Sequence, residues 1–199
     1  DLLIATAPPE QEAERDAYNH WVEESKVDGL ILDRLRIEDW RIRYLSEKQV
    51  PFSTLERSLD TLDYPSVEVD SMSGMTRLVG HVAGNGFRRM AFIGGPPALK
   101  IHVDRLRGFR VGLEQVNLAF DPRFEETGDL TSAGGYAATR RLLSTPDPPD
   151  AILCVNDETA FGVLRAAAET GLEPGRNFAV AGFDGVRDAR FSNPPLTTL

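Results

Sequence analysis

Cysteine and histidine are scarce in this sequence. Its 199 residues include one cysteine, Cys154, and 3 histidines. A single cysteine excludes an internal disulfide framework and is typical of a reducing compartment. So few thiol and imidazole groups also argue against a structural zinc site. We therefore expect no disulfide-stabilised or zinc-stabilised fold, no metal and no cofactor.

Long apolar runs and an excess of basic charge are also lacking. No stretch approaches the roughly 20 apolar residues of a membrane-spanning helix. The first residues, Asp1–Ile4, show no basic region followed by a long apolar run, so we expect no signal peptide and no membrane association. The chain has 22 Lys and Arg against 31 Asp and Glu, a formal net charge of -9. Binding to nucleic acid requires clustered Lys and Arg that neutralise its phosphates, so we do not expect this segment itself to bind nucleic acid.

The sequence contains few features that are typical of enzymes. Residues 94–97, Gly-Gly-Pro-Pro, lack the spacing of a phosphate loop, and their prolines remove amide donors. No GxGxxG or GxSxG motif occurs. The histidines, His20, His81 and His102, are expected on helix surfaces, and Cys154 is expected as a small buried apolar residue within a strand. The sequence therefore indicates a protein that is not an enzyme.

What the sequence does contain is an alternation of short apolar runs with helical patterns. Strands are expected at residues 2–5, 27–32, 50–55, 66–69, 89–93, 125–127, 151–155 and 178–183. Helices are expected at residues 10–26, 38–48, 73–84, 102–116, 132–143 and 158–170. Such alternation is typical of parallel sheets with right-handed crossovers and helices on both faces. We therefore expect an α/β fold of doubly wound parallel sheets, with no flexible linker inside it.

Polar residues follow two of the apolar strands directly. Asn156 comes after the run 151–155, and its carboxamide both donates and accepts hydrogen bonds. Asp184 comes after the run 178–183 and would be a charged acceptor for ligand hydroxyls. Ligands bind beyond the carboxyl ends of strands in open parallel sheets, so both residues are candidate contacts. Each also suits a local role, Asn156 as a helix cap and Asp184 as a turn residue.

Charged residues near two other strands are further candidates. Arg105 or Arg107, at the start of the helix expected at 102–116, could donate a forked pair of hydrogen bonds to a ligand. Glu56, at the end of the strand expected at 50–55, could accept hydrogen bonds. The plain alternatives are surface charge for either arginine and a solvated loop acid for Glu56.

A set of motifs occurs in a definite order along nearly the whole chain: Val27–Leu32, Val50–Phe52, Gly86–Gly95, Arg105–Phe109, Asn156–Gly162, Val180–Asp184 and Pro194–Thr198. In this order and spacing they resemble the effector-binding core of the lactose-repressor family of bacterial transcriptional regulators. The resemblance implies two similar α/β lobes around a cleft, like periplasmic sugar-binding proteins. It also implies a small effector, usually a sugar, bound in that cleft.

The family's organisation implies where the lobes and partners of this chain lie. The N-terminal lobe is expected at residues 1–69, without the family's first strand and helix, and the C-terminal lobe at residues 70–199, ending at the return crossover. The chain is expected to pass between lobes near Val69–Asp70 and again at or just past Thr197–Thr198. Effector binding then changes the lobe angle within a cytoplasmic homodimer. Operator DNA is contacted only by a helix-turn-helix headpiece, which is absent from this chain.

The family's ligand-binding positions can be carried over residue by residue. Its polar contacts match Arg105, Asn156 and Asp184, and its acidic contact at the end of a strand matches Glu56. Apolar residues stand where some sugar-binding members place a stacking aromatic or serines, namely Leu130 for the aromatic and Leu99 and Ile101 for the serines. An apolar-lined pocket with these polar groups suits a polyhydroxylated ligand that has apolar faces.

Two other functions remain open from the sequence. A free-standing sugar-binding protein for transport or chemotaxis would use the same fold, but an exported protein needs a signal peptide. An α/β enzyme acting on a nucleotide or sugar would need a phosphate loop, a metal cluster or an activated nucleophile. A reading frame that continues upstream into a basic helix-turn-helix sequence would decide for the regulator.

Overall fold

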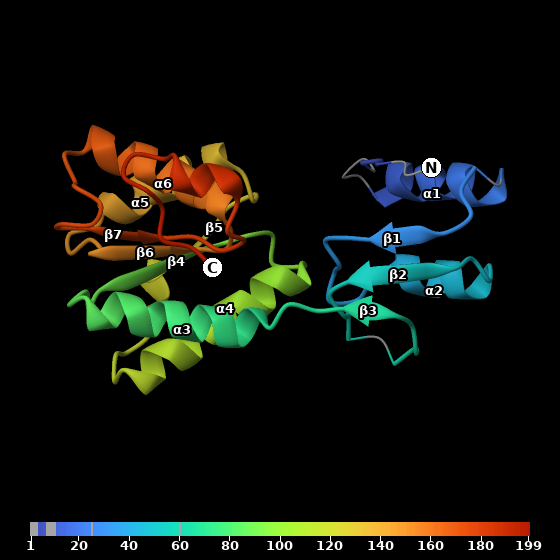
Figure 1. Cartoon of the computed structure of the whole chain (residues 1–199), viewed down its shortest axis with the longest axis horizontal. Helices are drawn as coiled ribbons and strands as arrows, with labels where there is room; N and C mark the ends of the chain where they lie inside the picture. Colours follow the sequence, from blue (N-terminus) through green and yellow to red (C-terminus); the bar gives the residue numbers. More distant parts are fainter. Residues whose placement is uncertain (1–3, 7–10, 25, 60) are drawn as a thin grey trace. The chain divides into compact units, whose positions relative to one another are not determined.

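The computed structural model describes residues 4–6, 11–24, 26–59 and 61–199. The chain divides into two compact units, Asp1–Glu68 (unit 1) and Val69–Leu199 (unit 2). Each unit has its own parallel sheet and its own core, so each is described by itself (Figure 1). In these described ranges, no helix has the length and apolar character needed to span a membrane.

Unit 1 is a small parallel sheet with two helices on one face. The strands are β1 (Leu30–Leu32), β2 (Phe52–Leu55) and β3 (Ser66–Val67), in the order β1-β2-β3. The helices are α1 (Gln11–Glu23) and α2 (Trp40–Glu47), which share one apolar core with the sheet: Tyr18, Leu32, Leu35, Ile42, Leu45 and Tyr64. Side chains alternate between the faces of a strand, so Ile31, Leu55 and Val67 lie on the other face, where they are exposed.

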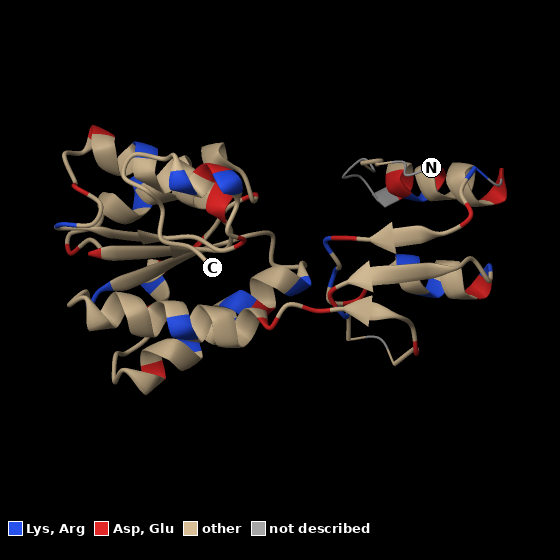
Figure 2. Ribbon diagram, in the orientation of Figure 1, with Lys and Arg blue, Asp and Glu red and all other residues tan. Residues whose placement is uncertain are grey.

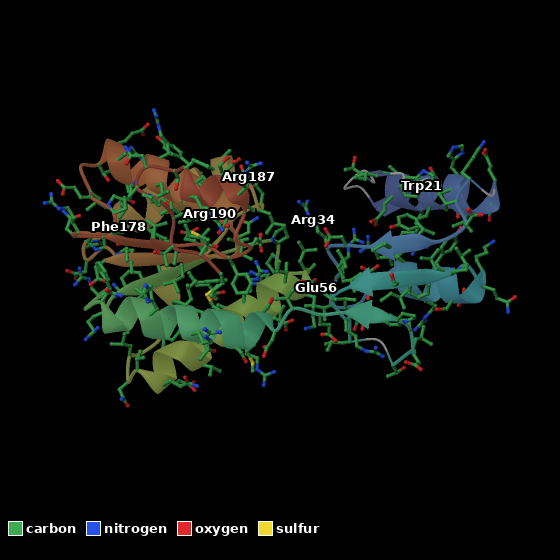
Figure 3. All side chains as sticks on the ribbon, viewed as in Figure 1. Trp21, Arg34, Glu56, Phe178, Arg187 and Arg190 are labelled. Carbon is green, nitrogen blue, oxygen red and sulfur yellow. The ribbon has the colours of Figure 1, made fainter. Side chains whose placement is uncertain are left out.

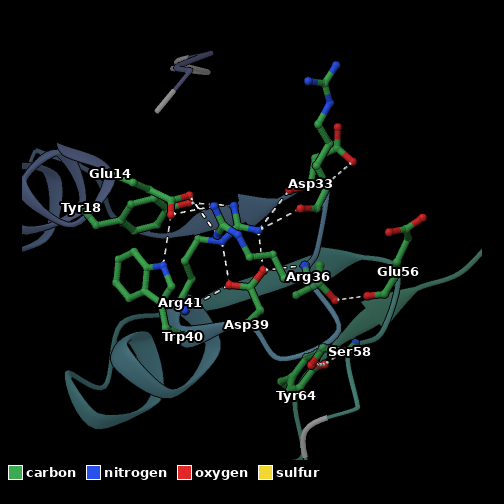
Figure 4. Close-up of polar contacts among 12 residues, drawn as sticks. Glu14, Tyr18, Asp33, Arg36, Asp39, Trp40, Arg41, Glu56, Ser58 and Tyr64 are labelled. Atoms are coloured by element: carbon green, nitrogen blue, oxygen red, sulfur yellow. Dashed lines mark hydrogen bonds and ion pairs between the residues drawn. The ribbon is translucent and has the colours of Figure 1, made fainter. Parts of the chain in front are cut away.

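A buried ion pair between Arg41 and Asp39 connects α2 with the loop that follows β1 (Figure 4). Arg41 donates from Nε to Oδ1 of Asp39 at 2.8 Å and from Nη2 to Oδ2 at 2.6 Å. The same Nη2 also donates to the carbonyl oxygens of Asp33 and Arg34. Burial alone would raise the pKa of Asp39, but the hydrogen bonds and charge of Arg41 hold that pKa below its ordinary value. The pair therefore stabilises the folded form with both groups charged.

Unit 2 is a three-layer structure around a parallel sheet of order β5-β4-β6-β7. Its strands are β4 (Met90–Gly94), β5 (Glu125–Thr127), β6 (Ala151–Cys154) and β7 (Ala179–Ala181). One face is covered by α3 (Ser71–Gly84) and α4 (Lys100–Gln115), and the other by α5 (Ser132–Leu143) and α6 (Asp157–Glu169) (Figure 1). The expected α/β fold with parallel sheets is confirmed.

Some expectations from the sequence are wrong. Ile4 and Ala5 lie in no strand, and residues 2 and 3 of that expected strand lie outside the described residues. His102 was expected on a helix surface but is only 5% exposed, because its ring packs beside Phe92 and against the backbone of Gly94. This burial lowers the pKa of His102.

In unit 2, two short helices were not predicted, whereas the burial of Cys154 was. Two short 3-10 helices were not predicted, η1 (Pro122–Phe124) and η2 (Arg187–Arg190). Cys154 is fully buried in β6, as expected, and burial raises the pKa of its thiol.

The close approach of α5 and α6 depends on Gly162. A Cβ atom at this position would lie 2.6 Å from the backbone nitrogen of Tyr136 and closer still to the carbonyl oxygen of Ser132. We expect Gly162→Ala to lower the free energy of unfolding of unit 2 by about 1–3 kcal/mol, the usual effect of overpacking. Urea denaturation measures this change.

Gly80 on α3 provides the matched control for that substitution. A Cβ atom there would meet nothing within 4 Å. Because Ala favours a helix interior over Gly by about 1 kcal/mol, Gly80→Ala should be neutral or stabilising. Equal effects of the two substitutions would contradict the role given to Gly162.

Candidate functional site

The predicted polar residues of unit 2 gather at the carboxyl edge of its sheet. Asn156 follows β6 and is the N-cap of α6, and Asp184 lies beyond the end of β7. Arg105 reaches the same edge from the second turn of α4. The structure joins Arg105 and Asp184 as an ion pair, with 3.0 Å between Nη1 and Oδ1. Of the two candidate arginines, Arg107 is instead exposed on the surface of α4.

Arg105 is a buried cation that links several elements of unit 2. Its side chain is 5% exposed. Besides Asp184, Nη1 donates to the carbonyl oxygen of Val155 at the end of β6, and Nε donates to Oγ of Ser71 on α3. The guanidinium lies over the ring of Phe183, 3.8 Å from its centroid, which is a favourable cation–π position. Arg105 is therefore held in place by the protein before any ligand arrives.

Asp184 adopts a backbone conformation that non-glycine residues rarely take. Its φ angle is 122°, in a region that is sterically costly for a residue with a Cβ atom. Its backbone N–H donates to the carbonyl oxygen of Leu199 at 2.8 Å, which helps hold that conformation. The side chain is 40% exposed, so the carboxylate reaches solvent while it remains paired with Arg105. Strain of this kind at a polar, accessible residue is typical of functional sites.

Asp157 is a residue whose role the sequence did not reveal. It is fully buried, and it holds the turn that carries Asp184. Oδ2 accepts from the backbone N–H of Val186 at 2.8 Å, and Oδ1 accepts from the hydroxyl of Thr198 at 2.5 Å. Its own N–H donates to the carbonyl oxygen of Phe183 at 2.9 Å. The only local signal was an acidic residue in the first turn of a helix, because the partners are distant in the sequence.

Asn156 acts as the helix cap that its sequence position allowed. Its Oδ1 accepts from the backbone N–H of Thr159 at 2.9 Å, and its Nδ2 donates to the carbonyl oxygen of Leu130 at 3.1 Å. The side chain is half-buried. A carboxamide has two donor hydrogens and two acceptor lone pairs, so these bonds leave capacity for a ligand. Capping and ligand contact are therefore compatible in this residue.

The apolar candidates pack against the core of unit 2. Leu130, at a φ of 70°, is 8% exposed, and its side chain lies against Gly95 at the end of β4. Leu99 and Ile101, at the start of α4, are half-buried and pack on the same core cluster. The structure therefore places these side chains on the core of unit 2.

Glu56 belongs to unit 1, where it follows β2 directly. Its φ angle is 89°, and its N–H donates to the carbonyl oxygen of Val67 at 2.8 Å. Arg34, with a φ of 52°, occupies the equivalent place after β1, so both lie at the carboxyl edge of the unit 1 sheet (Figure 3). This edge is where a parallel sheet binds ligands.

A pocket of about 450 Å³ lies at the Arg105–Asp184 pair. Residues of unit 2 line it: Val69, Asp70, Gly74, Arg77, Arg105, Phe183, Asp184 and Leu199. A second pocket of about 260 Å³ lies elsewhere on unit 2, among residues that include His81, Arg176 and Pro194, and it holds none of the predicted site residues. The first pocket is the better candidate because its size and its converging polar groups suit a small ligand. Among the described residues, no group of three or more His, Cys, Asp or Glu is placed to hold a metal ion.

The sequence matches one family model and several known proteins. Residues 79–199 match the family model described as a periplasmic binding protein-like domain. The HTH-type transcriptional repressor CytR of Escherichia coli strain K12 is 32% identical over 138 residues, which is 69% of this chain. The chain spans 40% of the length of that repressor.

Two solved structures with a similar fold are those of transcriptional regulators. A regulatory protein of the LacI family from Chloroflexus aggregans has a TM-score of 0.81 and 30% identity, covering 92% of this chain and 66% of that one. The transcriptional regulator CelR, solved as a cellobiose complex, has a TM-score of 0.83 and 29% identity, covering 93% of this chain and 57% of that one.

The fold and the matched family together define the class of domain to which this chain belongs. The chain belongs to the periplasmic binding protein-like domain family. It is similar to the effector-binding core of transcriptional regulators of the lactose-repressor family. The resemblance seen in the sequence is thereby confirmed.

Proposed function

We propose that this chain senses a sugar effector for a bacterial transcriptional regulator, and that the sugar binds at the carboxyl edge of unit 2. The observation that carries the proposal is the Arg105–Asp184 pair in the wall of a pocket of about 450 Å³. A preorganised donor and acceptor side by side suit a hydroxyl group, which both donates and accepts hydrogen bonds.

The chemistry of the pocket supports a sugar. In this proposal the Asp184 carboxylate accepts hydrogen bonds from ligand hydroxyls. Asn156 does not line the pocket itself, but it follows the neighbouring strand and would add a carboxamide to the same edge of the sheet. Leu199, which is 41% exposed, lines the same pocket and would offer apolar surface to the C–H face of a sugar ring. The relative CelR is solved with cellobiose, itself a sugar.

The regulatory part of the proposal follows from the relatives. CytR is named a transcriptional repressor, so we propose that this chain binds an effector without turning it over. Operator DNA would be contacted by a separate headpiece, in a cytoplasmic homodimer. In unit 2, helices α4 and α6 each carry residues of both charge signs (Figure 2), which suits a sensing role better than a DNA-binding one.

Four further ligand contacts remain predictions: Glu56, Leu130, Leu99 and Ile101. We expect Glu56→Gln to weaken effector binding by about 10-fold, because it removes one charged hydrogen bond acceptor. Titration calorimetry of the variant with the effector measures this, and an unchanged affinity would remove Glu56 from the site.

A thermal-shift screen tests the proposal. The chain is melted alone and with mono- and disaccharides, and a nucleoside set serves as the comparison. A ligand at 100 times its dissociation constant adds about 2.7 kcal/mol of stability, enough to raise the midpoint by a few degrees. We expect at least one sugar to do so. A cooperative melt raised by a nucleoside and by no sugar would contradict the sugar class, and a melt raised by neither would contradict the sensing role.

A further inference from the structure

We propose that His102 makes unit 2 sensitive to mild acid: the first turn of α4 packs on β4 while this imidazole is neutral, and protonation of the ring releases that turn. The proposal goes beyond the proposed function, because it does not depend on which ligand the domain binds. It is carried by the buried position of the ring, by its unpartnered nitrogen and by the way in which α4 begins.

The imidazole of His102 is buried with one nitrogen unpartnered. The residue is 5% exposed, and its ring packs beside that of Phe92 on β4, with 6.3 Å between the centroids. A Cβ atom at Gly94 would collide with Nδ1, so the ring fills the space that this glycine leaves. Nδ1 is shielded from solvent, and none of the described residues forms a hydrogen bond with it.

This environment accepts a neutral ring but not a charged one. A neutral imidazole carries one proton, which can stay on Nε2, whereas the protonated ring carries one on each nitrogen. Protonation of His102 would therefore place a charge and an unpaired N–H donor in the core, and both are costly there. His102 is also the third residue of α4, and the positive end of a helix dipole disfavours a cation in the first turn.

The charges near the ring do not offset its burial. Burial is the largest influence, and it lowers the pKa of His102 below the ordinary value of 6.5. Glu125 on β5 acts in the opposite direction, but Arg110 on α4 adds to the lowering, and these two residues pair with each other at 2.7 Å. Lys100 and Asp104 in the first turns of α4 also pair with each other, and β4 carries no ionisable side chain.

The start of α4 depends on packing because it has no side-chain cap. Helices α2, α3, α5 and α6 each begin at a residue whose side chain accepts from a backbone N–H of the first turn. The N-cap of α4 is Leu99, which makes no such bond. Leu99, Ile101 and the ring of His102 hold this turn against the core. Expulsion of a charged ring therefore releases the first turn of α4 before the rest of unit 2.

Unit 2 should consequently lose stability in mild acid. Because the pKa of His102 is lower in the folded protein than in the unfolded chain, the unfolded chain binds more protons between the two values. The stability that depends on the neutral ring is thus present above about pH 6.5 and falls as the pH decreases toward the folded pKa.

The experiment compares amide hydrogen exchange in the wild type, His102→Leu and His81→Gln. Leucine is apolar and does not titrate, and His81 is an exposed histidine on α3 that controls for the loss of an imidazole. Protection factors, corrected for intrinsic exchange, are measured at about pH 7.5 and about pH 5 for the amides of residues 103–107, which follow the first turn of α4. The amides of α6 are the internal reference.

In the wild type and in His81→Gln, we expect protection at residues 103–107 to fall at least about 5-fold more than protection in α6 between the two pH values. In His102→Leu, we expect the two regions to change in parallel. The same acid loss at residues 103–107 in His102→Leu as in the wild type would overturn the proposal. So would an equal loss in both regions of the wild type.

An NMR titration of the wild type tests the proposal independently, even if His102→Leu does not fold. The Cε1–H signals of the three histidines are followed from about pH 8 to about pH 5. We expect the His102 signal to titrate with a midpoint below 6.5, the value of a solvated imidazole. A midpoint at or above 6.5 would overturn the proposal, because the folded protein would then tolerate the charged ring.

Discussion

Replacing Asp184 with either alanine or glycine is expected to abolish the sugar response, whereas the glycine variant should be the more stable of the two because of its backbone. Both changes remove the carboxylate that accepts ligand hydroxyls. Two lost charge-assisted hydrogen bonds weaken binding by at least about 100-fold. Titration calorimetry with the sugar found in the thermal-shift screen measures this loss.

The stabilities of the two variants should differ because of the φ angle of 122° at Asp184. Alanine keeps a Cβ atom in that region, whereas glycine enters it freely, so Asp184→Gly should be more stable than Asp184→Ala by about 1 kcal/mol. The lost ion pair is common to both variants, and it contributes little because Asp184 is 40% exposed. Urea denaturation measures the difference.

This comparison separates binding from folding. If affinity fell in proportion to stability across the two variants, Asp184 would act on the fold and not on the ligand. If both variants kept wild-type affinity, Asp184 would not be a ligand contact.

The second large effect is expected in unit 1, on removal of Asp39. The Asp39 side chain is 0% exposed, and Arg41 beside it is 9% exposed. Asp39→Ala leaves the Arg41 cation buried without its acid and removes the acceptor that caps α2 at the N–H of Arg41. Breaking a buried pair in this way costs about 3–5 kcal/mol. We expect unit 1 to be largely unfolded in this variant, as measured by amide hydrogen exchange of β1 and α2.

The control for Asp39 is Asp16, an exposed acid on α1. Asp16→Ala should change stability by no more than about 0.5 kcal/mol. Similar hydrogen exchange in the two variants would contradict the role assigned to the Asp39–Arg41 pair.

The Asp39–Arg41 pair should also affect how the stability of unit 1 depends on pH. The pKa of Asp39 in the folded protein lies below its ordinary value of 3.8. A carboxyl group with a lowered folded pKa contributes stability above its unfolded pKa and loses it as pH falls through the folded pKa. We therefore expect the wild type to lose stability below about pH 4 more steeply than Asp39→Asn, which lacks the titrating group. Parallel acid curves for the two proteins would contradict this.

Local patterns in the sequence were enough to predict most of the sheet and two of the edge residues. Residues 151–155 are all buried, and their sequence is continuously apolar. This pattern is typical of the central strands of a parallel sheet. Asn156 could be predicted because a cap residue directly follows that run. Asp184 could be predicted because it follows the apolar run at 178–183, although its φ of 122° could not.

The contacts that assemble the site depend on tertiary structure. Arg105 pairs with Asp184, and Asp157 binds Thr198, across long stretches of sequence that no periodicity connects. His102 looked like a surface residue, because its helix position alone does not show that a glycine at 94 leaves room for its ring. The apolar run near residue 4 looked like a strand, but pairing with a neighbouring strand decides that outcome, and Ile4 has none.

A crystal structure of the chain with its best-binding neutral sugar tests the central claim most directly. We expect sugar hydroxyls within hydrogen-bond distance of the Asp184 carboxylate, with the Arg105–Asp184 ion pair intact. We also expect the sugar to lie in the pocket that those two residues line. A sugar bound instead in the pocket beside His81 and Arg176, or one that leaves Asp184 untouched, would contradict the account.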